Sequence, residues 1–99
     1  MNRNPLDVIK ENNSELFQNV TATRALAFQE GALPAKYKYL IALAMDADHG
    51  AADGVKSLAK QALEAGATKE EIFETLQTAF YIAGAGSVYT AARALNELF

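Results

Sequence analysis

The sequence predicts an all-α protein, and three observations lead to that prediction. Apolar residues return every three or four positions along most of the 99 residues, which is the period of an amphipathic helix. No segment shows the two-residue alternation of a half-buried strand. Glycines and prolines interrupt the helical pattern, so the connections between helices are short. We therefore expect a single-domain bundle of five to six helices.

Two helices are expected at the N-terminal end. Asn4-Pro5 predicts the start of a short helix, because asparagine is a favoured N-cap and proline is favoured at the first helical position. This helix fades into Asn12-Asn13, and Ser14 is the expected N-cap of the second helix, which ends at Gly31. One stripe of the second helix consists of Leu16, Phe17, Val20, Arg24, Ala27 and Phe28.

The remaining helices begin after Leu33-Pro34. The first of them is apolar nearly all round over residues 39–47, which is typical of a central, buried helix. Gly66 is expected to terminate the next helix, and Thr68 with Glu71 predicts a capping box for the one after it. The last helix is expected to start at Ser87. Side chains expected to face the core are Val55, Leu58, Ala59, Ala62, Leu63, Ile72, Phe73, Leu76, Ala79, Phe80, Ala83, Val88, Ala91, Ala92 and Leu95.

The composition excludes several classes of function. A net charge of −3 with scattered lysines offers no basic face, so we expect no nucleic-acid partner. The absence of cysteine excludes disulfides, thiolate metal sites and thiol catalysis. We expect no membrane association, because no apolar run is long enough for a membrane span, and a cytoplasmic location, because no secretory signal is evident. The 51% hydrophobic content of so short a chain suggests that another subunit covers part of it.

Two segments resemble the carboxymuconolactone decarboxylase/AhpD-like family. They are LPAKYKYLIALA at residues 33–44 and ALEAGATKEEI at residues 62–72, the latter followed by a helix that closes on Ala83-Gly84-Ala85-Gly86. The resemblance implies an AhpD-like helical bundle, which we divide into N-terminal helices (residues 1–25) and a family-like core (residues 26–99) within one domain. It also implies a homo-oligomer, for which we expect a hexamer.

Thiol peroxidases of this family carry a Cys-x-x-Cys-x-x-x-His motif and a relay glutamate. In register with this sequence, the two cysteines fall on Ala51 and Gly54, the histidine on Leu58 and the glutamate on Tyr39. We therefore expect no peroxidase activity, since that reaction needs a thiolate. The branch without the cysteine pair implies a cofactor-independent decarboxylase or lyase acting on a carboxylated small molecule. The alternative is a non-catalytic, oligomeric protein that binds a small molecule or serves as a scaffold.

Three residues are predicted to be catalytic. Asp46 and His49 are three apart and share a helix face, so Asp46 would orient the imidazole and His49 would move a proton. Tyr39 lies on the same stripe, although a buried tyrosine often only satisfies a hydrogen bond. Alternatively, His49 ends a helix favourably against its dipole and Asp53 caps the next. A metal site on Asp46, His49 and Asp53 is a weaker alternative with a single histidine, and we expect no metal or other cofactor.

Substrate binding is assigned to Arg24, Glu30 and Asp53. Arg24 and Arg93 are the arginines in or beside apolar stripes, and either would suit a substrate carboxylate or an ion pair between subunits. Glu30 precedes Gly31, where it lines a cleft or ends a solvated helix. The expected ligand is a small molecule.

Overall fold

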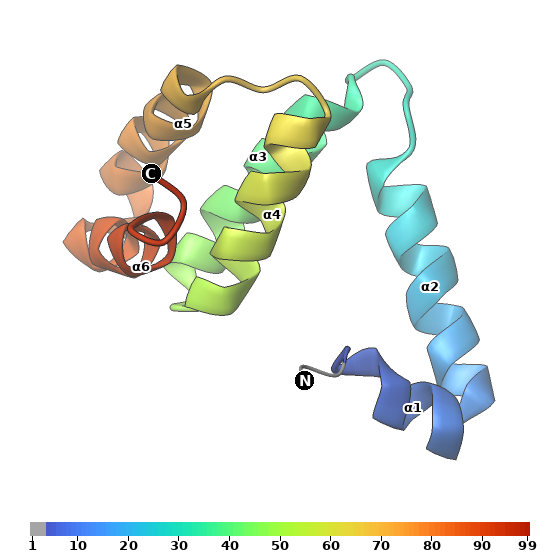
Figure 1. The fold of residues 1–99 in the computed structure, drawn as a ribbon. Helices are drawn as coiled ribbons and strands as arrows, with labels where there is room; N and C mark the ends of the chain where they lie inside the picture. Colours follow the sequence, from blue (N-terminus) through green and yellow to red (C-terminus); the bar gives the residue numbers. More distant parts are fainter. Residues whose placement is uncertain (1–3) are drawn as a thin grey trace.

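The computed structural model describes residues 4–99, and this part of the chain is helical without any strand (Figure 1). The predicted all-α bundle is confirmed. The helices are α1 (Leu6–Asn12), α2 (Ser14–Phe28), α3 (Ala35–Asp48), α4 (Ala52–Glu64), α5 (Lys69–Ala83) and α6 (Ala85–Leu95).

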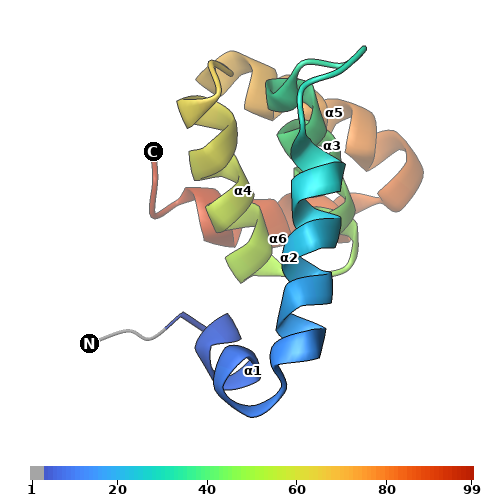
Figure 2. The ribbon, with the colours of Figure 1, turned by 90° about the vertical axis from the view of Figure 1, so that its right-hand side faces the viewer.

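Helix α3 is the centre of the fold. It contacts α2, α4, α5 and α6, while α6 also packs on α4 and α5. In both views α3 and α4 lie side by side, with α2 on one side of them and α5 and α6 on the other (Figures 1 and 2). The core forms where α3, α4, α5 and α6 meet. Its buried members are Leu40, Leu43, Ala47, Val55, Ala59, Ala62, Ala67, Ile72, Leu76, Ala91, Ala94 and Leu95.

The connection from α4 to α5 follows the sequence prediction. Gly66 adopts a φ of +103°, which a side chain would strain, and α4 ends just before it. The capping box is present: the Glu71 N–H donates to Thr68 Oγ1 at 3.0 Å, and the Thr68 N–H donates to Glu71 Oε1 at 2.8 Å. Glu71 also pairs with Lys36 of α3, at 3.1 Å between Nζ and Oε2, so one carboxylate starts α5 and ties it to α3.

Three predicted helix boundaries were wrong by a few residues. Asn13, rather than Ser14, caps α2, because its side chain accepts a hydrogen bond from the Leu16 N–H at 3.1 Å. Helix α2 ends at Phe28, ahead of Gly31, and α6 starts at Ala85, ahead of Ser87. Helix α2 runs unbroken through residue 25, and the division of the chain at that point stays a prediction.

Helices α1 and α2 form an arm (residues 6–28) that stands away from the body formed by α3–α6 (Figure 1). Helix α1 packs against α2, and α2 contacts α3. No side chain of either arm helix is buried. The arm is therefore attached to the body mainly at one end of α2, and most of its apolar stripe is open. None of the helices in residues 4–99 has both the length and the apolar content of a membrane span.

Several side chains predicted to face the core are exposed in the single chain. Phe73, Phe80 and Val88 are about half exposed, and Ala92 is also exposed. These predictions were wrong because α5 and α6 form an open groove that no other segment of the described chain covers. Helix α3 is central as predicted but not fully buried, since the side chains of Ile41 and Met45 on its outer side are exposed.

Candidate functional site

The C-terminal half of α2 meets α3 and α4 through aromatic and polar side chains. The ring of Phe28 stacks on that of Tyr39 from α3, with centroids 4.6 Å apart and planes at 16°. The Arg24 guanidinium lies 5.8 Å from the centroid of the Phe28 ring, and its Nη2 donates a hydrogen bond to Gln61 Oε1 on α4. Gln61 is oriented by its own bond to Ser57 Oγ, at 3.1 Å. Three helices thus contribute to one polar and aromatic cluster.

Arg24 stands between two shallow grooves on this cluster. One has a volume of about 370 Å³ and is lined by Thr21, Arg24, Ala25, Phe28, Gln29 and Tyr39. The other has a volume of about 380 Å³ and is lined by Asn19, Val20, Thr23, Arg24, Ala27 and Phe28, all from α2. The first groove therefore combines a permanent cation, an aromatic wall and a phenol. An arginine of this kind suits a planar carboxylate, because its N–H groups match both carboxylate oxygens.

Asp46 and His49 lie further along α3. Asp46 is half-buried, and its carboxylate lies against α4 at Gly54, where an added Cβ would come within 2.1 Å of Oδ2. His49 follows the last residue of α3 and is exposed. No hydrogen bond or ion pair joins these two side chains in residues 4–99. Ten residues of helix separate His49 from Tyr39, roughly 15 Å along the axis.

The structure thus brings Tyr39 and Arg24 into one groove and leaves the predicted acid–base pair outside it. Asp46 and His49 do not line either groove at the α2–α3–α4 contact. Their position reflects the α3–α4 turn, where Gly50 has a φ of +79° and the chain reverses. The catalytic roles of these residues stay predictions.

The other predicted binding residues lie apart from the Arg24 groove. Glu30 is exposed in the connection between α2 and α3. Asp53 is exposed in the first turn of α4, and the alternative that it caps this helix was wrong, since Ala51 occupies the cap and no side chain bonds there. Arg93 lies on α6, where its Nη2 donates to Thr90 Oγ1 at 3.4 Å.

The alternative of a metal site has no geometric support in the described part of the chain. Residues 4–99 contain no cluster of three or more histidine, aspartate or glutamate side chains that could hold a metal ion. His49 and Asp53 lie on either side of the turn, and both are exposed.

Gln61 is a member of the Arg24 cluster that sequence reasoning missed. It lies among Lys60 and Glu64 on the polar side of α4, and nothing in its local pattern distinguishes it from a solvated surface residue. Its partner Arg24 is 37 positions away in the sequence, so only the three-dimensional structure, in which α2 contacts α3 near α4, reveals the pair.

The contact between α3 and α5 shifts the pKa values of Glu71 and Lys36. The hydrogen bond from the Thr68 N–H, followed by that from Lys36, lowers the pKa of Glu71 below its ordinary value of 4.5. The bond to Glu71 raises the pKa of Lys36 above 10.5. Glu71 belongs to the capping box of α5 and Lys36 is its ion-pair partner, so we attribute both pKa shifts to this cap and to the packing of α5 on α3.

The family model that matches this chain is that of the carboxymuconolactone decarboxylase family, and it covers residues 14–97. The chain belongs to this family. The match includes α2, so the helix that carries Arg24 is part of the family domain. Comparisons with curated proteins and with solved structures give no match.

The positions that correspond to the peroxidase motif show why thiol chemistry has no basis here. Ala51 is the N-cap of α4, Gly54 receives the Asp46 carboxylate, and Leu58 packs against the core. None of these side chains can supply a nucleophile.

Proposed function

We propose that this chain binds a carboxylated small molecule in the groove between Arg24 and Tyr39, and that it acts on this ligand as a cofactor-independent carboxy-lyase. The observation that carries the proposal is the convergence of the Arg24 guanidinium with the stacked rings of Phe28 and Tyr39, the second of which is a phenol, where α2 meets α3 and α4. Membership of the carboxymuconolactone decarboxylase family supports the reaction type.

The proposed reaction needs little from the protein. Arg24 holds the carboxylate, and the flat part of the ligand lies against Phe28. The carbon–carbon bond to the carboxylate breaks, carbon dioxide leaves, and the electron pair passes into the conjugated system of the lactone as a dienolate. A hydrogen bond from the Tyr39 hydroxyl stabilises the negative oxygen, and an acid then returns a proton to carbon. His49 is the proposed source of that proton; it makes no hydrogen bond or ion pair with Asp46 and lies outside the groove, so the proton reaches the ligand through water.

A non-catalytic binding protein is the second candidate function. It is favoured by the exposed position of His49, which lies outside the groove and makes no hydrogen bond or ion pair with Asp46. On this alternative the Arg24 groove binds a carboxylate and no bond is broken.

The binding site is tested by replacing Arg24 and Arg93 separately. Titration calorimetry with γ-carboxymuconolactone should show roughly tenfold to hundredfold weaker binding by Arg24→Gln, because a charge-assisted hydrogen bond contributes about 1.5–3 kcal/mol. Arg93→Gln is the matched control and should bind as the wild type does. Equal affinity of the two variants for the ligand would show that Arg24 does not bind the carboxylate.

Catalysis is tested by carbon dioxide release from the same compound. A rate above background that falls in Tyr39→Phe and in His49→Ala supports the lyase. An unchanged rate in His49→Ala would exclude His49 as the proton donor. Binding without any release of carbon dioxide would select the non-catalytic alternative.

We further propose that the protein works as a homo-oligomer, with a hexamer as the expected order. The unburied arm and the open groove of α5 and α6 support this proposal. Light scattering that returned the mass of one chain, 10.7 kDa, would refute it.

A further inference from the structure

Helix α2 carries a stripe that no part of the described chain covers and that includes the wall of the second groove beside Arg24. Its members Leu16, Val20, Thr23 and Ala27 are spaced by four, three and four residues, the spacing of a helix packed against other helices. All four are exposed. Helix α1 instead packs near Phe17, whose ring lies 5.6 Å below the ammonium of Lys10.

An arm of this kind is not stable on its own. Helices of 7 and 15 residues with no buried side chain lack the tertiary packing that supplies most helical stability in proteins. The stripe therefore needs a cover from outside the arm.

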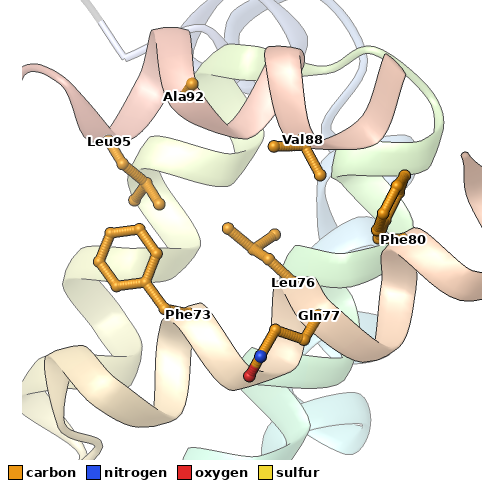
Figure 3. Close-up of a pocket in the computed structure, with 7 residues that line it drawn as sticks. All are labelled: Phe73, Leu76, Gln77, Phe80, Val88, Ala92 and Leu95. Carbon is orange, nitrogen blue, oxygen red and sulfur yellow. The ribbon is translucent and has the colours of Figure 1, made fainter. Parts of the chain in front are cut away.

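The body has an apolar groove that could cover this stripe in another copy of the chain. It lies between α5 and α6, has a volume of about 470 Å³, and is lined by Phe73, Leu76, Gln77, Phe80, Val88, Ala92 and Leu95 (Figure 3). Gln77 is its single polar member. Aromatic and aliphatic side chains from the two helices face one another across the groove, so its floor is apolar along its length (Figure 3). At 15 residues each, α2 and α5 are the same length.

The surface area of the chain indicates that a second copy is the cover. The chain exposes 6772 Å², whereas a compact monomer of 10.7 kDa exposes about 5,500 Å². The excess exceeds the roughly 800 Å² that each partner buries in a standard interface. The radius of gyration is 14.3 Å, against about 12.6 Å for a compact domain of 99 residues. The extended arm accounts for this shape.

We propose that the α2 stripe of one copy packs into the α5–α6 groove of a second copy. The proposal rests on the homo-oligomer proposed above and names the two surfaces that form it. Because the arm and the groove lie on opposite sides of α3 and α4 (Figures 1 and 2), the contact runs head to tail. A head-to-tail contact uses two different surfaces, and it forms a ring when the rotation from copy to copy closes, as the proposed hexamer requires.

A second groove, between α3 and α5, is the competing acceptor. It has a volume of about 450 Å³ and includes the hydroxyl groups of Tyr37, Thr75 and Thr78. The α5–α6 groove has one polar side chain against three in this groove, so covering it with the apolar stripe removes fewer polar groups from water.

The absence of cysteine allows a direct test by disulfide cross-linking. The double variant V20C/F80C, oxidised mildly and run on a non-reducing gel, should give a ladder of covalent multimers up to the size of the ring. The control V20C/M45C places the second thiol in the α3–α5 groove, at a position about as exposed as Phe80, and should give no ladder. The single variants should remain uncross-linked.

The outcomes separate this inference from the proposed homo-oligomer. A ladder with V20C/M45C instead of V20C/F80C would overturn the choice of groove. Multimers by light scattering without any ladder would overturn the contact and leave the homo-oligomer standing. A monomeric mass for the wild type would overturn both.

A second pair of variants guards against misfolding of the cysteine variants. Val20→Glu should lower the mass in solution while circular dichroism still shows a helical body. Leu26→Glu, on the same helix but off the stripe and 68% exposed, should leave the mass unchanged. An unchanged mass in Val20→Glu would overturn the proposal.

Discussion

The substitution Gly54→Ala tests how closely the Asp46 side chain of α3 packs against α4. A glycine inside an exposed helix costs roughly 0.5–1 kcal/mol relative to alanine, so Gly54→Ala would ordinarily stabilise α4. Here the new Cβ would lie 2.1 Å from Asp46 Oδ2 and 2.9 Å from its Cγ, so the carboxylate must leave its place. The carboxylate is the far end of a flexible side chain, so turning it aside costs about 0.5–1.5 kcal/mol, which offsets the gain in helix propensity.

We therefore expect Gly54→Ala to leave the free energy of unfolding within about 0.5 kcal/mol of the wild-type value. In an Asp46→Ala background the clash is absent, and the same substitution should raise it by about 0.5–1 kcal/mol. The double-mutant cycle then gives a coupling of about 0.5–1 kcal/mol between the two positions, at the lower end of the range seen for residues in contact.

Urea denaturation followed by circular dichroism measures the four free energies of this cycle. The protein concentration is held constant, because assembly shifts the apparent stability. The reasoning is refuted if Gly54→Ala stabilises the protein equally in both backgrounds, since the Asp46 carboxylate would then not be held against α4.

Two further predictions concern the capping box at the start of α5. Thr68→Ala removes the acceptor of the Glu71 N–H and should cost about 1 kcal/mol, or roughly 4–8 °C in Tm, whereas Thr78→Ala, in the same helix, should change Tm little. The pKa of Glu71 is lower in the folded state than its ordinary value of 4.5, so its contribution to stability is present above that pH and is lost as the pH falls toward the folded pKa. In Glu71→Gln the urea midpoint should depend less on pH over this acid range than in the wild type. In Glu70→Gln, which removes a charge beside the capping box, the midpoint should depend on pH as it does in the wild type.

The local features of the fold could be predicted because neighbouring residues decide them. The Thr68 capping box and the termination at Gly66 depend on residues within a few positions of each other, and both are confirmed. The predicted N-cap of α2 was wrong for the same local reason. Asn13 and Ser14 are both good caps, and the pattern does not say which one accepts the hydrogen bond.

The candidate site could be predicted only in part. Tyr39 and Arg24 were each singled out from the sequence, but on separate grounds and for separate roles. Their shared groove depends on Phe28 stacking on Tyr39, which is a contact between α2 and α3. The spacing of three residues predicts that Asp46 and His49 share a helix face, but α3 ends at Asp48 and His49 lies beyond it.

By itself, the sequence determined that this protein is all-helical and lacks thiol chemistry, because periodicity and residue type suffice for both conclusions. Tertiary structure decided which apolar stripes become core. Phe73, Phe80 and Val88 have the same helical spacing as buried residues, and they are exposed because α5 and α6 open a groove between them. Periodicity identifies the face of a helix that seeks a partner, and only the arrangement of the helices shows whether that partner lies in the same chain.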